Sequence, residues 1–214
     1  VSDMDGAEYE AYTQEQFGVF THVLDALAAK GRTFRIRHCA NSGALTRYPE
    51  MYLDMVRPGI ALYGEGSDAE RLGLKPVMRL KTSISTIKVL DPDTTVSYGR
   101  TFRTEGKTRM GVLPIGYADG FFRGLSNRMA VQTADGPAPL RGRICMDMCR
   151  VDLTALPEVK VGDTVEIFGQ TQSVDSLAAI LNTIPYELTC AVSKRVPRLY
   201  MEQGRETERS LRLL

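Results

Sequence analysis

Apolar residues recur at helical spacing in the first part of the chain. Between Thr13 and Lys30 each of them has another three or four positions away, which is the spacing of one helical face. These positions are Phe17, Phe20, Val23, Leu24 and Leu27. Thr13 is a candidate N-cap, and Gly31 is a residue that commonly ends a helix. The pattern predicts an amphipathic helix that ends at Gly31.

Two short apolar segments follow, and each leads into a polar or glycine-bearing turn. In RIRHCANSGAL, a strand precedes a turn at residues 41–43 and a short helix toward Tyr48. In MYLDMVRPGIALYG, a strand over residues 55–57 precedes a loop that contains Gly59. Two consecutive βα units predict a parallel sheet or barrel, in which ligands bind at the ends of the strands where these turns lie.

The pattern changes after Lys75-Pro76. Short alternating or β-branched segments separated by turn residues predict an all-β domain, either a small barrel or packed sheets. The segments are KTSISTIKVL, RMGVLPIGYA, MAVQTA, RICMDMCRVDL and DTVEIFG. A helix over residues 173–181 and a last strand over residues 186–190 complete the expected elements. We therefore expect one domain over residues 1–77, a second over 78–206, and a tail over 207–214. The charged stretch EQGRETERSLRLL, residues 202–214, is expected to be loosely held.

Composition excludes several classes of function. The formal net charge of +1 provides no field that would attract nucleic acid or an anionic membrane. No apolar run approaches the roughly 20 residues that a membrane helix needs, and the acidic N-terminus lacks signal-peptide features, which favours the cytoplasm. The 4 cysteines contain no C-x-x-C pair and the chain has only 2 histidines, so we expect free thiols and no metal site.

Several residues near the predicted strand ends have the properties of ligand-binding groups. Ser42 and the Gly59-Ile60 peptide offer a hydroxyl and backbone N–H groups of the kind that bind phosphate. From the residues alone, a helix cap and an ordinary turn are the simpler explanation. Arg57 carries a permanent charge at a strand end, so it must be paired or face a ligand. His38 lies at the matching end of the preceding strand and is its candidate partner.

One tyrosine in the second half stands in an unusual setting. Tyr98 lies between Ser97 and Gly99, where a small neighbour on each side leaves room to present the hydroxyl. A phenol acts as an acid or base when nearby cations lower its pKa from about 10. Packing in a core is the alternative explanation for a tyrosine at this position.

Seven motifs, taken in order, resemble those of the alanine racemase family, whose members depend on pyridoxal 5'-phosphate. Each motif alone is weak, but their shared order and compatible separations are specific. The motifs are HCANS, VRPGIALYG, VSYG, GYADG, GRICMDM, VGDTVEIFG and YELTC followed by KRVPRLY. The resemblance implies that residues 1–77 form the last βα units of a (β/α)8 TIM-like barrel, followed by a C-terminal β-barrel-like domain.

The resemblance also implies roles for individual residues. The expected ligands of the cofactor phosphate are Ser42, Gly59, Ile60 and Tyr186. Arg57 matches the arginine that faces the pyridine nitrogen, and His38 would support it. Tyr98 matches a catalytic acid/base that acts across a homodimer interface on the other subunit's cofactor. The backbone N–H of Met146 would contact the substrate carboxylate. The expected lining of the substrate entrance is Tyr117, Arg123, Arg143, Asp147 and Ile184.

By this resemblance, the chain is the C-terminal part of an enzyme that interconverts L-alanine and D-alanine for cell-wall synthesis. The family's cofactor lysine and second catalytic base belong to earlier barrel strands, so we expect the isolated chain to be inactive. We also expect it either to self-associate or to leave residues before about 76 poorly ordered. Two alternatives stay open: a serine-preferring racemase module, with a membrane domain attached elsewhere, or a non-catalytic dimerisation or binding module that completes a partner chain's site.

Overall fold

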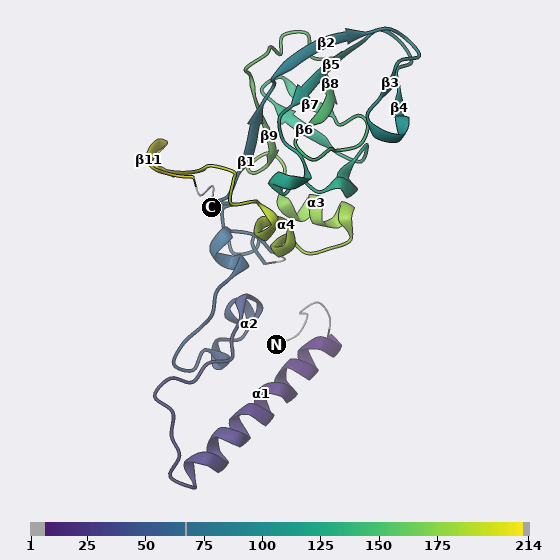
Figure 1. The fold of residues 1–214 in the computed structure, drawn as a ribbon. Helices are drawn as coiled ribbons and strands as arrows, with labels where there is room; N and C mark the ends of the chain where they lie inside the picture. The colour runs from purple at the N-terminus through teal and green to yellow at the C-terminus, as the bar shows by residue number, and fades with distance from the viewer. Residues whose placement is uncertain (1–6, 67, 212–214) are drawn as a thin grey trace. The chain divides into compact units, whose positions relative to one another are not determined.

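The computed structural model describes residues 7–66 and 68–211 (Figure 1). The chain divides into two compact units, Val1–Val77 and Met78–Leu214, and each is described by itself. Within the described residues, no helix combines the length and the apolar character that a membrane-spanning segment requires.

The first unit consists of helices and extended segments. Its elements are α1 (Ala7–Ala28), α2 (Ser42–Arg47) and the 3₁₀ helices η1 (Pro49–Met51) and η2 (Ile60–Tyr63). The predicted stop is confirmed, because Gly31 adopts φ +73° and its N–H bonds to the carbonyl oxygen of Ala28 at 2.8 Å. The predicted N-cap is wrong: Thr13 is buried inside α1, which already includes the helix-forming residues before it.

The two strands predicted in this unit are absent from its described residues. Residues 35–41 and 52–58 form no strand, and isolated backbone bonds join them: Arg57 N to Ala40 O at 2.9 Å and Asp54 N to Arg37 O at 3.1 Å. A strand needs a continuous ladder of backbone bonds, and within the described chain these two segments share only the isolated bonds and pair with no strand. The βα interpretation therefore identified the helices of this unit but not its strands.

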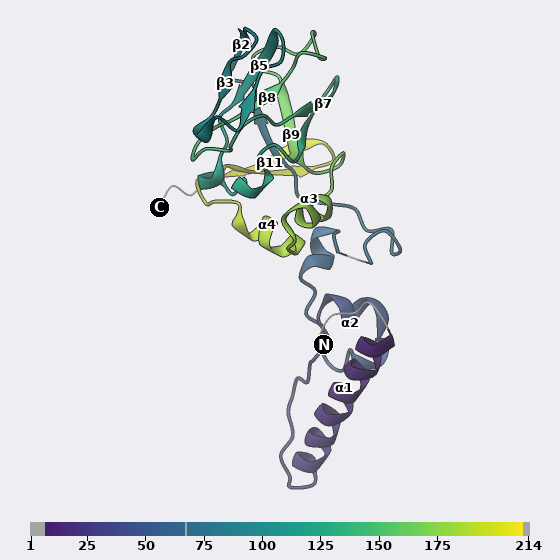
Figure 2. The same cartoon turned by 90° about the vertical axis from the view of Figure 1, so that its right-hand side faces the viewer.

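A small apolar core holds the first unit together. The buried residues are Ala40, Ala44, Tyr48 and Met51, and Phe17, Cys39 and Val56 pack against them. Phe17 brings the inner face of α1 to this core, while the amide of Gln14 donates to the carboxylate of Glu50 in η1 at 3.0 Å. Figure 2 shows α2 beside the N-terminal turns of α1.

The second unit is built from antiparallel sheets. Two of them carry its core, in the strand orders β1-β9-β6-β7 and β2-β5-β8. Their bounds are β1 Leu80–Ser83, β2 Thr86–Leu90, β5 Thr108–Leu113, β6 Ala130–Thr133, β7 Gly136–Pro139, β8 Cys149–Asp152 and β9 Thr164–Phe168. The two-stranded sheet β3 (Thr95–Val96) with β4 (Phe102–Arg103) frames the turn that carries Tyr98.

These sheets are open, so the expectation of a β-barrel-like closure is wrong. In β7, Pro137 and Pro139 have no N–H to donate, which suits a sheet edge and opposes pairing with a further strand. The interior between the sheets is nonetheless continuous. Its most deeply buried side chains include Leu113, Val131, Leu140, Val151, Val165 and Ile167. Alternating burial along β8 and β9 directs Val151, Val165 and Ile167 inward.

Helices and a hairpin complete the second unit. Helix α3 (Val174–Leu181) agrees with the predicted helix, and the Ser173 hydroxyl caps it by accepting from Ser176 N at 3.2 Å. The predicted strand over residues 186–190 is instead helix α4 (Pro185–Ala191). Pro185 occupies the first turn, where its fixed φ favours a helix start. In Figure 1, α3 and α4 lie side by side.

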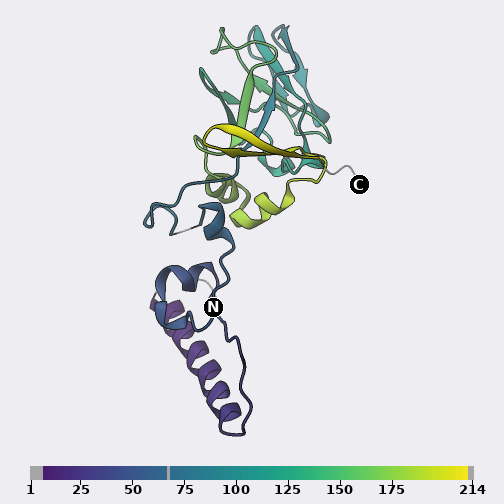
Figure 3. The same cartoon turned by 90° about the vertical axis from the view of Figure 1, so that its left-hand side faces the viewer.

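The end of the chain is more ordered than the sequence suggested. Strands β10 (Arg198–Glu202) and β11 (Arg205–Ser210) pair as an antiparallel hairpin, which Figure 3 shows as a separate two-stranded ribbon. Residues 205–210 of the charged end are thus paired in a strand, while residues 212–214 lie outside the described chain; the tail over residues 207–214 stays a prediction.

Candidate functional site

Ser42 organises the loop that follows residue 57. It is the first residue of α2, where Asn41 caps the helix by accepting from Ala44 N at 3.0 Å. Ser42 is only 5% exposed, and its Oγ accepts hydrogen bonds from Gly59 N at 2.8 Å and Ala61 N at 3.4 Å. The Ser42 hydroxyl thus joins the start of α2 to the loop at residues 59–61. Its oxygen accepts both bonds, and its hydrogen can still be donated to another acceptor.

Arg57 and His38 form a direct pair. Arg57 Nη1 lies 2.8 Å from His38 Nδ1, and both residues are exposed within the first unit. Because a guanidinium group has only donors, Nδ1 accepts in this bond and the ring carries its proton on Nε2. The contact expected between these residues is present; their cofactor roles stay predictions.

A strained turn presents Tyr98 to solvent. Ser97 adopts φ +66° and ψ 178°, a combination that is essentially restricted to glycine, and Gly99 follows at φ +71°. The Oγ of Ser97 donates to the carbonyl oxygen of Arg143 at 2.7 Å and fixes the turn to the loop before β8. The Tyr98 side chain is 73% exposed in this unit, so the turn displays its hydroxyl and does not bury it in the core.

The segments that carry Tyr117 and Met146 are held together by backbone bonds. Tyr117 N donates to Cys145 O, and Ala118 N to Met146 O, both at 3.0 Å. Gly116 permits this approach, because a Cβ atom there would lie 2.2 Å from Cys145 O. Gly116, the first glycine of the GYADG motif, therefore allows the close contact between the two loops. The side chains of Tyr117 and Met146 are exposed beside this contact.

Arg195 joins the same two loops by ion pairs, and sequence reasoning did not single it out. Its Nε donates to Asp119 Oδ1 at 2.7 Å and its Nη2 to Asp147 Oδ1 at 2.6 Å. Hydrogen bonds from Arg195 to Asp119 and Asp147 raise the pKa of the guanidinium further above its ordinary value. The only signal in the sequence was the presence of Asp119 in GYADG and of Arg195 in KRVPRLY. Neither motif by itself indicates that these two residues are in contact.

The predicted site residues fall into two groups, one in each unit. Ser42, Arg57, Gly59, Ile60 and His38 lie together in the first unit. In the second unit, Ser97 links Tyr98 to the Arg143 backbone, and the Tyr117 and Met146 segments meet. Other predicted residues of the second unit stand on separate elements: Arg123 begins η5 (Arg123–Leu125), Ile184 is the N-cap of α4, and Tyr186 lies in its first turn.

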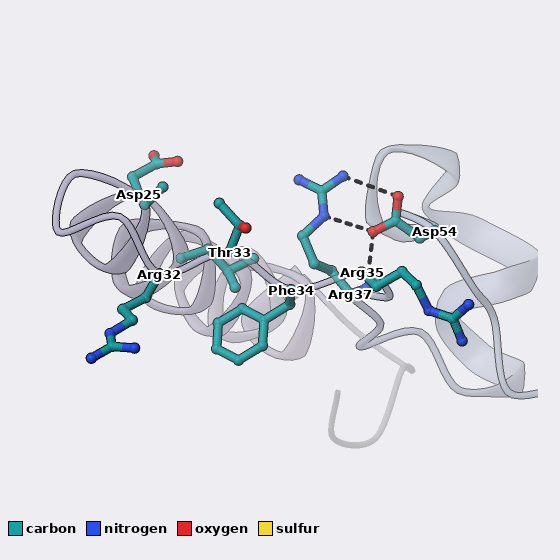
Figure 4. Close-up of a pocket in the computed structure, with 9 residues that line it drawn as sticks. Asp25, Arg32, Thr33, Phe34, Arg35, Arg37 and Asp54 are labelled. Atoms are coloured by element: carbon teal, nitrogen blue, oxygen red, sulfur yellow. Dashed lines mark hydrogen bonds and ion pairs between the residues drawn. The ribbon is translucent and has the colours of Figure 1, made fainter.

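A pocket of about 180 Å³ lies elsewhere in the first unit, between the end of α1 and residues 32–37 (Figure 4). Arg37 and Asp54 both line this pocket and point toward one another. Arg37 donates two hydrogen bonds to the carboxylate, from Nε to Oδ2 at 2.6 Å and from Nη2 to Oδ1 at 3.1 Å. Hydrogen bonds from Arg37 lower the pKa of Asp54 to about 2. None of the predicted site residues lines this pocket, so it offers no support for the proposed cofactor site.

Known proteins resemble this chain over both units. The family model described as alanine racemase, N-terminal domain, matches residues 2–67, and that described as alanine racemase, C-terminal domain, matches residues 77–200. Alanine racemase of Desulfovibrio desulfuricans is 46% identical over 92% of this chain and 54% of that protein. Alanine racemase of Clostridium tetani is 42% identical over 91% of this chain and 53% of that protein.

Solved structures agree. Alanine racemase of Clostridium difficile 630 in complex with cycloserine gives a TM-score of 0.90 at 38% identity, covering 96% of this chain and 56% of that chain. The enzyme of Bacillus anthracis with bound L-Ala-P gives 0.87 at 31% identity, covering 94% and 54%. Over the part of those structures that it covers, the chain therefore has the fold of alanine racemases. It belongs to the alanine racemase family, and it spans about half the length of the curated relatives it matches.

Proposed function

We propose that this chain is the C-terminal part of a pyridoxal 5'-phosphate-dependent alanine racemase that interconverts L-alanine and D-alanine. The observation that carries the proposal is the pairing of Ser42 with Gly59 and of Arg57 with His38 in the first unit. These contacts assemble a hydroxyl, a glycine-bearing backbone loop and a fixed cation. A ligand with a phosphate and a ring nitrogen matches that set of groups.

The residues present fit this cofactor. The Ser42 hydroxyl, already held by two N–H donors, can donate its own proton to a phosphate oxygen, and the Gly59-Ile60 peptide lies at the same loop. Tyr186 would supply another phosphate contact. Arg57 does not give up its proton, so it would leave a pyridine nitrogen facing it unprotonated. When bound, pyridoxal phosphate withdraws electrons from the substrate and makes the α-proton acidic.

Tyr98 would carry one of the two proton transfers. Racemisation removes the α-proton from one face and returns a proton to the other, so two bases on opposite faces are required. The strained turn at Ser97 and the exposure of the phenol support a role for Tyr98 at a site formed with another subunit of a homodimer. The second base and the cofactor lysine would come from the earlier part of the N-terminal domain.

The loops around Tyr98 would bind the amino acid. The Met146 N–H would donate to the substrate carboxylate, and the segment beside it carries Tyr117, which would narrow the approach. The other residues proposed to line the entrance are Arg123, Arg143, Asp147 and Ile184. The enzyme would act in the cytoplasm, and its product, D-alanine, would be used for cell-wall synthesis.

We further propose that residues 1–77 complete a (β/α)8 barrel, that residues 78–206 form the C-terminal domain, and that residues 207–214 end it. The bonds between residues 37 and 54 and between 40 and 57 support this view of the first unit, because extended segments already lie beside each other there. Neighbouring strands would supply the missing ladder partners and convert both segments into strands.

A complementation experiment tests the proposal. The chain is mixed with a separately produced polypeptide that holds the preceding part of an alanine racemase N-terminal domain, and pyridoxal phosphate is added. We expect D-alanine to form from L-alanine in the mixture and in neither part alone. Ser42→Ala should weaken cofactor retention in the mixture, whereas Ser176→Ala, a surface serine change in α3, should leave it unaltered.

Two other results would redirect the proposal. Faster turnover of L-serine than of L-alanine would identify a serine-preferring module. Stable association of the two parts without turnover of either amino acid would identify a non-catalytic dimerisation or binding module.

A further inference from the structure

Arg195 connects the loop that carries Asp119 with the loop that carries Asp147, and the two carboxylates differ in exposure. Asp119 is well enclosed, with its side chain 14% exposed, whereas Asp147 is 56% exposed. Arg195 reaches both carboxylates at 2.7 Å and 2.6 Å through different nitrogen atoms. A planar guanidinium can hold two acceptors in fixed directions at once, which an ammonium group cannot do with the same geometry.

The enclosed end of this connection is anchored independently. Asp119 Oδ2 accepts from Gly116 N at 2.9 Å, and the Asp119 carbonyl oxygen accepts from Ser193 N at 3.1 Å. Asp119 is therefore a fixed point in η4 (Tyr117–Asp119), two residues after Tyr117. Asp147, which directly follows Met146, is held to that fixed point through Arg195.

The charges matter as well as the geometry. Asp119 and Asp147 bring two negative charges to a region where Tyr117 and Met146 are exposed. Arg195 lies between them and cancels part of that charge. Without it, an approaching carboxylate would meet two uncompensated carboxylates and would be repelled.

We propose that Arg195 is a positioning residue, which fixes the backbone N–H of Met146 and the side chain of Tyr117 to receive the carboxylate of an amino-acid substrate. This inference rests on the proposed function for the identity of the substrate. Arg195 acts through Asp119 and Asp147 and does not itself contact the reacting atoms.

The first test measures amide hydrogen exchange in the 214-residue chain. In Arg195→Gln and Arg195→Lys, exchange in residues 116–120 and 145–148 should rise about tenfold, because the charge-assisted bonds that join the loops are lost. Arg209→Gln, which breaks the ion pair of Arg209 with Glu206 in the hairpin, is the matched control and should leave both loops unaltered. Unaltered exchange in the Arg195 variants would overturn the inference.

A second variant covers the case in which loss of Arg195 prevents folding. Asp147→Asn leaves the Arg195–Asp119 pair in place and should raise exchange in residues 145–148 more than in 116–120. Equal protection of residues 145–148 in this variant and in the original chain would also overturn the inference.

The third test uses the complemented enzyme with L-alanine as the probe. Arg195→Lys should raise KM about tenfold and change kcat less than about twofold, since ground-state and transition-state binding of the carboxylate are lost together. An unchanged KM would overturn the role in substrate binding. Absence of activity with the unaltered chain would overturn the proposed function, and the exchange measurements would then decide the positioning role alone.

Discussion

The hydroxyl of Ser97 donates to the backbone carbonyl of Arg143 at 2.7 Å, while Ser97 itself adopts a conformation that normally requires glycine. One residue thus combines an unfavourable backbone with a favourable hydrogen bond, directly before Tyr98. The bond holds the turn in a shape that the local sequence alone would not choose.

Ser97→Gly and Ser97→Ala should separate these two effects. Both changes remove the bond to Arg143, which costs about 1 kcal/mol. Only glycine also relieves the strained backbone, which is worth about 1–3 kcal/mol. We expect the glycine variant to unfold at a higher urea concentration than the alanine variant, as measured by circular dichroism. The reverse order would show that the turn is unstrained.

Gly142→Ala should destabilise the same turn from the other side. A Cβ atom at Gly142 would lie 2.7 Å from the Ser97 Cβ, and the residue has φ +78°. We expect a loss of about 1–3 kcal/mol in the free energy of unfolding. In the double variant Ser97→Gly/Gly142→Ala, part of that loss should disappear because the Ser97 Cβ is gone. Strict additivity of the two changes would contradict the contact.

Gly116→Ala should disrupt the junction between the Tyr117 and Met146 segments. The new methyl group would meet the carbonyl oxygens of Cys145 and Met146 at 2.2 and 2.3 Å, and backbone atoms cannot rotate away as side chains do. We expect destabilisation by about 2 kcal/mol or more, measured by thermal unfolding. Gly106→Ala is the control, because nothing lies within 4 Å of a Cβ there.

Tyr98→Phe should separate chemistry from stability. The side chain is 73% exposed within its unit, so removal of the hydroxyl should change the free energy of unfolding by less than about 0.5 kcal/mol. Racemisation by the complemented enzyme should fall about 10²- to 10⁴-fold, the usual contribution of a positioned acid or base. Activity within a factor of two of the original would exclude Tyr98 as the catalytic group.

Asp68 should make the first unit sensitive to acid. Burial raises the pKa of Asp68, but hydrogen bonds from Arg47, Thr46 and Arg71 outweigh it and lower the pKa to about 2 from 3.8. Because the folded-state pKa is depressed, the stabilisation is complete above about pH 4 and is lost as the pH falls toward 2.

Asp68→Asn provides the test of this pH dependence. The variant should be less stable than the original at pH 6, and the difference should shrink between pH 4 and pH 2, as followed by helix content. Asp135→Asn, an exposed change in the turn between β6 and β7, is the control and should show no such convergence. A difference that stays constant across this range would contradict the depressed pKa.

Helical periodicity over a long segment predicted a helix correctly. A single candidate cap at Thr13 and a short apolar run over residues 186–190 gave wrong predictions. The helical spacing before Gly31 identified α1, because periodicity is a local property. The helix expected over residues 173–181 is present as α3, and the structure adds the cap at Ser173. The run Tyr186–Cys190 was too short for periodicity to separate strand from helix, and Pro185 was the better guide. The helix-forming residues before Thr13 likewise outweighed its capping tendency.

Contacts between distant residues were mostly beyond sequence reasoning. Pairing of Arg57 with His38 could be expected, because both lie at matching ends of adjacent segments. The Arg195 link to Asp119 and Asp147 joins positions 76 and 48 residues apart, and no local pattern marks it. Likewise, the segments over residues 35–41 and 52–58 would form strands only beside neighbouring strands, and the local sequence does not show whether such neighbours are present.

The β10-β11 hairpin has a practical consequence for handling the protein. A two-stranded ribbon has two outer edges whose N–H and C=O groups could template pairing with other chains. Strand β11 reads RETERS, so charges of both signs stand along one of those edges, and Arg209 is paired with Glu206. Neutralising these charges should favour edge-to-edge aggregation, because charged side chains along a strand edge oppose pairing with other chains.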